Sequence, residues 1–178
     1  MYGKNITKTV FRTVLSCLGV LACALLQVSV FPYMRFFGCI PDITAACLLC
    51  LSLFENEKTV CVLAVCSGFV LHSLGTWGVS YYPLLFLAAV CLCMVLSSVF
   101  FKNAFLSVMT AASFTFVAEG VLTTVFLMSD GASYTDAFVG AFLPQLAYSL
   151  VCTVAIYPLC KLHGFVFGVR RRSDYYDE

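Results

Sequence analysis

Long uncharged, apolar stretches alternate with short charged segments along the whole chain. The 22 residues 13–34 carry no charge, 43 uncharged residues lie between Lys58 and Lys102, and 24 more fill positions 137–160. A transmembrane helix needs about 20 predominantly apolar residues, so the 43-residue stretch fits two helices joined by a tight turn. Residues 75–78, which begin and end with glycine, supply the backbone freedom for that turn. These three stretches therefore predict four membrane-spanning helices.

Two further apolar stretches each contain one carboxylate. Residues 36–54 contain Asp42, next to Pro41, and residues 103–129 contain Glu119 near their middle. Because proline is tolerated in the first turn of a helix, Pro41 is expected to open the second helix, which then begins near Asp42. The chain is thus predicted to be all-α, a polytopic integral membrane protein with six transmembrane helices.

The composition favours lipid rather than water as the solvent. Of the 178 residues, 62% are hydrophobic and 11% are charged, whereas soluble domains are about 45–50% apolar and about 25% charged. Six helices leave only short connections, so we expect a single transmembrane domain over residues 1–178, with a short basic N-terminal segment and a short cytoplasmic C-terminal tail. The formal net charge of +1 gives no bulk electrostatic basis for binding nucleic acid.

The positions of the basic residues predict the orientation. Six spans place both termini on one side, and nine of the ten basic residues fall on that side: Lys4, Lys8, Arg12, Lys58, Lys102, Lys161, Arg170, Arg171 and Arg172. Only Arg35 falls on the other side. By the positive-inside rule both termini are expected in the cytoplasm. The turn near Trp77 and the polar loop at 130–136 are then outside, where Trp77, Tyr81 and Tyr82 fit an interfacial aromatic belt.

Ionisable side chains within a membrane are candidate sites, because burying them unpaired is costly. Asp42 is expected to cap the second helix, where the helix dipole and free N–H groups favour a carboxylate. For Glu119 we expect a hydrogen bond with Gln145 or nearby threonines that holds the fifth and sixth helices together. A contact between Glu119 and a partner's helix is the alternative.

Small and polar residues mark two further helix faces. In the third span Cys61, Ala64, Gly68 and His72 recur at intervals of three and four residues, a spacing that permits close helix packing. His72 is expected to make a structural hydrogen bond, with a proton-transfer or ligand role as the alternative. In the sixth span a polar face follows Pro144 and consists of Gln145, Ser149, Cys152 and Thr153.

The eleven cysteines lie almost entirely within apolar runs, where free cysteine behaves as a small hydrophobic residue. Cys47 and Cys50 form a C-x-x-C pair, but the chain has only two histidines to complete a metal site, so neither a metal nor another cofactor is expected. The sequence also contains no Walker A, H-E-x-x-H or Gly-rich dinucleotide motif. We therefore expect a protein that is not an enzyme.

Short motifs along nearly the whole chain occur in an order that resembles a known family. They are Leu26-Gln27, Phe31-Pro32, Gly38-Cys39-Ile40-Pro41-Asp42, Gly68-Phe69-Val70-Leu71-His72, Gly78, Tyr81-Tyr82, Asn103-Ala104-Phe105, Glu119, Leu143-Pro144-Gln145 and Tyr157-Pro158-Leu159. The family is the rod shape-determining protein MreD of bacteria. Its members commonly carry an acidic residue where this chain has His72, so no role of that carboxylate is transferred here.

The resemblance implies a non-enzymatic scaffold of the bacterial inner membrane that helps to organise peptidoglycan synthesis and cell shape. The implied partners are the bitopic protein MreC, a penicillin-binding transpeptidase with its glycosyltransferase partner and, indirectly, the actin-like MreB. The alternative is the substrate-binding membrane subunit of a vitamin transporter, which has a similar six-helix fold. Such a subunit needs an outer pocket lined by aromatic residues, whereas a scaffold needs a lipid-facing groove for another protein's helix.

Overall fold

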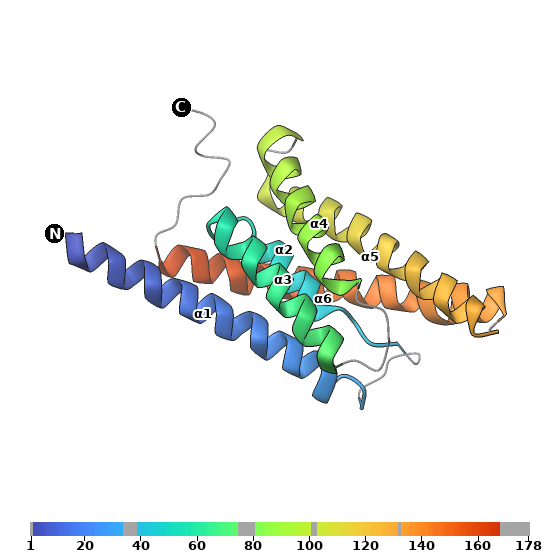
Figure 1. The fold of residues 1–178 in the computed structure, drawn as a ribbon. Helices are drawn as coiled ribbons and strands as arrows, with labels where there is room; N and C mark the ends of the chain where they lie inside the picture. The colour runs from blue at the N-terminus through green and yellow to red at the C-terminus, as the bar shows by residue number, and fades with distance from the viewer. Residues whose placement is uncertain (1, 34–38, 75–80, 101–102, 132, 168–178) are drawn as a thin grey trace.

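The computed structural model describes residues 2–33, 39–74, 81–100, 103–131 and 133–167 (Figure 1). Its helices are α1 (Tyr2–Ser29), α2 (Ile43–Leu51), α3 (Glu57–Leu74), α4 (Tyr82–Val95), α5 (Ala104–Ser129) and α6 (Leu143–Val166). Two π-helical segments, η1 (Leu96–Phe100) and η2 (Asp136–Phe142), follow α4 and precede α6. No β-strand occurs within these ranges, so the all-α prediction is confirmed.

Five helical stretches are long and apolar enough to cross a membrane: Thr9–Ser29, Glu57–Leu74, Tyr82–Val99, Ala104–Ser129 and Asp136–Val166. Large apolar side chains remain exposed on them, among them Phe114, Val151 and Phe165. Contiguous apolar surface of this kind is covered by lipid in a membrane protein. The architecture is therefore that of a multi-pass membrane protein, and these five stretches correspond to five of the six predicted spans.

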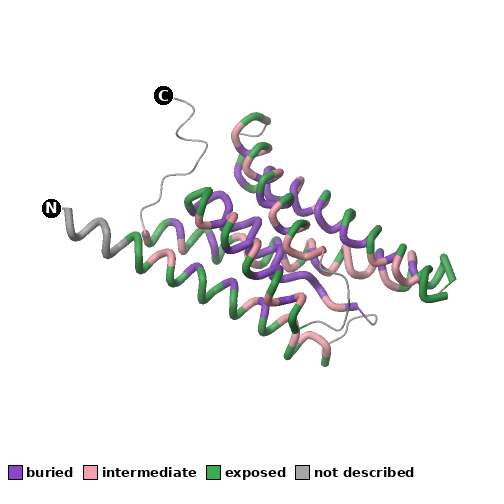
Figure 2. The backbone as a smooth tube through the Cα atoms, viewed as in Figure 1, coloured by how far each residue is buried: buried purple, intermediate pink, exposed green. Residues whose placement is uncertain are grey.

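The predicted second span differs from the others. Its helix, α2, has only nine residues, so it rises about 14 Å, whereas a hydrocarbon core is about 30 Å thick. The predicted helix extended to Phe54, but the chain turns at residues 52–55 instead. All nine residues of α2 are buried, and Figure 2 shows them enclosed by the surrounding helices. A helix that is apolar on every side is typical of a protein core, and α2 packs against α1, α3, α4, α5 and α6.

Segment 42–55 runs antiparallel to α1. At its beginning, the backbone N–H and the hydroxyl of Thr44 donate to Oε1 of Gln27, near the end of α1. At its end, Glu55 pairs with Arg12, near the beginning of α1. The rise of α1 between Arg12 and Gln27 is about 22 Å. A short helix with its flanking residues thus returns along about half of the length of α1.

The beginning of α1 and the end of α6 lie side by side at one end of the bundle (Figure 1). Phe11 in α1 and Phe167 after α6 lie with their ring centroids 6.0 Å apart. The predicted turn at 75–78, the basic residues Arg35 and Lys102, and the C-terminal tail lie outside the described residues.

Glycines and prolines decide how closely the helices approach. Gly68 of α3 touches the start of α4 so closely that a β-carbon there would collide with the backbone of Pro83. In α5, a β-carbon on Gly120 would collide with the ring of Phe142 in η2. Pro144 lies in the first turn of α6, and because it has no N–H to continue the helical ladder, the wider π-helical turns of η2 precede it.

Candidate functional site

Asp42 begins α2 deep within the bundle. Residues 39–42 precede the helix without helical structure, because proline at 41 disfavours the helical conformation of the residue before it. As predicted, Asp42 is the N-cap, and its Oδ1 accepts a hydrogen bond of 2.9 Å from the backbone N–H of Ala45. Its own N–H donates to Oγ of Ser149 in α6 at 3.0 Å. The residue is thus held through both its side chain and its backbone, and it is only 1% exposed.

Glu119 lies in the middle of α5 and is 3% exposed. Nε2 of Gln145, in the first turn of α6, donates a hydrogen bond of 3.1 Å to its Oε1. The predicted bond between the fifth and sixth helices is therefore present. The nearby hydroxyls of Thr115 and Thr124 donate to backbone carbonyls of α5, which leaves the amide of Gln145 as the donor to Glu119.

The carboxyl groups of Asp42 and Glu119 lie close enough to act electrostatically on each other. Each has one oxygen that accepts an N–H bond, from Ala45 and from Gln145 respectively. The other oxygens, Oδ2 of Asp42 and Oε2 of Glu119, are buried and have no hydrogen-bond partner among the described residues. Two ionised carboxylates have only acceptors, so they cannot satisfy each other without a proton.

Polar groups from other helices surround this acid pair, which we define as Asp42 with Glu119. The amide of Gln27, in α1, interacts with Asp42 while its Oε1 accepts from Thr44. Tyr81 and Tyr82, at the start of α4, lie close enough to act electrostatically on both carboxyls. No Lys or Arg in the described part of the chain forms an ion pair with either acid, since the recorded ion pair joins Arg12 to Glu55.

The sequence identified Asp42 and Glu119 individually, but it did not predict that they lie close together. The sequence predicts Asp42 at the outer end of a long helix and Glu119 at the middle of another. Because α2 is short and follows a non-helical segment, Asp42 instead lies at the depth of Glu119. The one sequence signal was Pro41 in the middle of an apolar stretch, which favours a break in the helix rather than its first turn.

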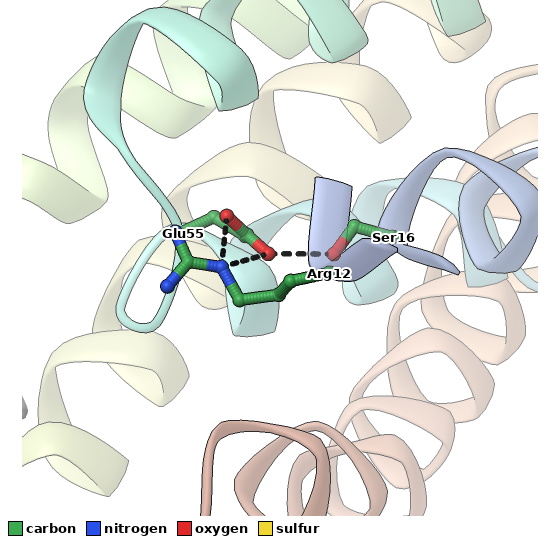
Figure 3. A network of polar contacts seen from close by, with 3 residues as sticks. All are labelled: Arg12, Ser16 and Glu55. Atoms are coloured by element: carbon green, nitrogen blue, oxygen red, sulfur yellow. Dashed lines mark hydrogen bonds and ion pairs between the residues drawn. The ribbon is translucent and has the colours of Figure 1, made fainter. Parts of the chain in front are cut away.

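A second polar cluster lies at the other end of α2 and was not predicted (Figure 3). Nε of Arg12 is 3.1 Å from both carboxylate oxygens of Glu55, and Oγ of Ser16 donates to Oε1 of Glu55 at 2.8 Å. The Glu55 side chain is fully buried, whereas that of Arg12 is 14% exposed. These contacts attach α1 to the turn between α2 and α3.

The remaining predicted residues have packing positions. Gly68 lies at the contact between α3 and α4, and Pro144 begins α6 beside Gln145. His72 is half-buried, and its Nδ1 is buried with no hydrogen-bond partner within the described ranges. The structural hydrogen bond expected for His72 is therefore not seen at this nitrogen.

None of the eleven cysteines forms a disulfide. The thiols of Cys23, Cys47 and Cys160 contact one another between α1, α2 and α6. Among the described residues, no group of three or more His, Cys, Asp and Glu side chains is arranged to hold a metal ion. These three thiols thus fill space between helices, and the acid pair is the candidate functional site.

Comparison with known protein families, characterised proteins and solved structures finds no match to this chain.

Proposed function

We propose that this chain is a non-enzymatic scaffold of the bacterial cell-wall elongation machinery, acting in the inner membrane as the resemblance to MreD implies. One observation carries the proposal: motifs that underlie the resemblance meet at one interhelical centre. Gln27, Asp42, Glu119 and Gln145 come from four helical segments and connect around the acid pair. Short motifs that are scattered along the sequence support a family resemblance more strongly when their residues bond to one another in the folded bundle.

The proposal includes six crossings with both termini in the cytoplasm. The path of residues 42–55 supports the sixth crossing, because this segment returns along about 22 Å of α1. Non-helical backbone at membrane depth is tolerated when it is buried in protein, and Pro41 and Asp42 are buried. The predicted excess of basic residues on the side of the termini supports the orientation.

A groove on the lipid-facing side of α5 suits a scaffold. Its volume is about 370 Å³, and Met109, Thr110, Ser113, Phe114 and Val117 line it. The hydroxyls of Thr110 and Ser113 donate to the backbone of their own helix, so the groove presents a mainly apolar wall. Helices associate in lipid through close packing at such surfaces, and we assign the groove to the single transmembrane helix of the bitopic partner MreC.

Depletion of the protein in its rod-shaped host tests the cellular function. We expect round, wide cells, because elongation would lose its membrane organiser. Depleted cells that keep a normal rod shape would contradict the proposal.

Affinity purification in mild detergent tests the partner. The bitopic wall-synthesis protein should accompany the wild-type chain, whereas an ATPase pair or a bound vitamin would favour the transporter alternative. Ser113→Phe fills the groove and should reduce recovery of the partner. Val151→Phe, at a position that is 66% exposed on α6, is the matched control and should leave recovery unchanged.

A further inference from the structure

In the acid pair, each carboxyl group has one oxygen with a hydrogen-bond donor and one without. Oδ1 of Asp42 and Oε1 of Glu119 each accept from an N–H group, while Oδ2 and Oε2 have no partner in the described part of the chain. Both side chains are more than nine-tenths buried, at 1% and 3% exposure. A buried acceptor without a donor is costly, and two carboxyl groups close enough to interact can both be satisfied by a single proton.

The surroundings leave no other described group to neutralise the pair. Gln27 faces it from α1, Gln145 and Ser149 from α6, and Tyr81 and Tyr82 from the start of α4. Of these groups only Tyr81 and Tyr82 can lose a proton, and both are uncharged while protonated. No Lys or Arg within the described ranges pairs with Asp42 or Glu119. The described residues also offer no third His, Cys, Asp or Glu to complete a metal site.

We propose that Asp42 and Glu119 form a proton-binding site that holds one proton between Oδ2 and Oε2. When the pair binds this proton from water, its charge changes from −2 to −1 and an O–H donates to the opposite oxygen. The N–H groups of Ala45 and Gln145 donate to the pair and stabilise its remaining negative charge. This site goes beyond the scaffold function and exists independently of which partner the chain binds.

The bound proton controls the contact between two helices. With the proton in place a hydrogen bond ties the start of α2 to the middle of α5. Without it two like charges face each other in surroundings of low dielectric constant, where their repulsion is strong. Proton release therefore loosens the packing of α5, the helix that also carries the groove.

Infrared spectroscopy of the purified protein tests the site. Across the pH range in which the chain stays folded, we expect one C=O band of a protonated carboxyl group that shifts in D₂O and disappears as the pH rises. Glu119→Gln supplies a permanent N–H donor in place of the proton, so the band should be lost. Asp136→Asn changes an exposed carboxylate and should leave the band intact.

Three outcomes would overturn the proposal. The wild-type protein could show no protonated carboxyl band at any pH at which it is folded. The band could persist unchanged in Asp42→Asn, which would assign the proton to Glu119 alone. Sodium chloride could raise the thermal stability more than an equal concentration of choline chloride at constant pH. If this effect required both Asp42 and Glu119, the pair would be a cation site instead. Because the first outcome is judged on the wild-type chain, a failure of either variant to fold leaves the proposal testable.

Discussion

The hydrogen bond between Gln145 and Glu119 joins α6 to α5 inside the bundle. Glu119→Leu removes the acceptor and leaves the Gln145 amide buried without its hydrogen-bond partner. We expect a loss of about 1–3 kcal/mol in the free energy of unfolding, measured as thermal unfolding of the purified protein. Glu119→Gln keeps a donor and an acceptor and should be mild. Unchanged stability of the Leu variant together with reduced partner recovery would instead place Glu119 at the partner interface.

The contact between Arg12 and Glu55 is the other described charged connection within the bundle (Figure 3). Arg12→Met leaves a fully buried carboxylate with only Ser16 as its recorded donor. Removing one partner of such a pair costs about 3 kcal/mol, and the partial exposure of Arg12 reduces this figure. The double variant Arg12→Met with Glu55→Gln should recover part of the lost thermal stability. Equal losses in the single and double variants would show that the pair is not coupled.

At the scale of residues, local chemistry could be predicted while long-range pairing could not. The cap formed by Asp42 followed from its place after proline, and the bond from Gln145 followed from two polar groups on adjacent predicted helices. The acid pair required the depth of Asp42, and the pairing of Arg12 with Glu55 required the path of α2. Both depend on where helices end in space, which side-chain pattern alone does not determine.

At the scale of elements, α3 and α4 form a close pair because Gly68 has no side chain. Gly68→Ala would push a β-carbon into the backbone of Pro83, which cannot move aside as a flexible side chain would. We expect destabilisation by about 1–3 kcal/mol, measured by thermal unfolding. Gly19→Ala in α1 is the matched control, since a β-carbon there meets nothing within 4 Å. Equal stability of the two variants would exclude close packing at Gly68.

The boundaries of α2 show why the second predicted span is not a long helix in the structure. An apolar run of 12 residues, 43–54, fits either part of a spanning helix or a buried core helix, and periodicity does not separate them when every side is apolar. The structure selects the buried helix. The five long helices were predictable because each has at least 18 residues of sustained hydropathy.

At the scale of the whole molecule, the buried segment changes how crossings are counted. A count of long helices gives five, and an odd number would place the two ends of the chain on opposite sides. In the bundle the rings of Phe11 and Phe167 lie together, which supports our proposal that segment 39–55 carries the chain back across the membrane. On this proposal a short helix and non-helical backbone make one passage, which is tolerated because the other helices surround them.

Labelling with a membrane-impermeant thiol reagent tests this passage. Tyr33, which is 90% exposed after α1, and Asn56, which is exposed before α3, flank the segment. If the segment crosses, Tyr33→Cys should react in intact cells, whereas Asn56→Cys should react only after the membrane is permeabilised. Asn103→Cys should behave like Asn56→Cys, and Ser133→Cys like Tyr33→Cys, because these exposed positions lie at opposite ends of α5. The parent chain with its eleven native cysteines provides the background signal. Reaction of Tyr33→Cys and Asn56→Cys from the same side would show that the segment enters and leaves on one face, and the six-crossing topology would be wrong.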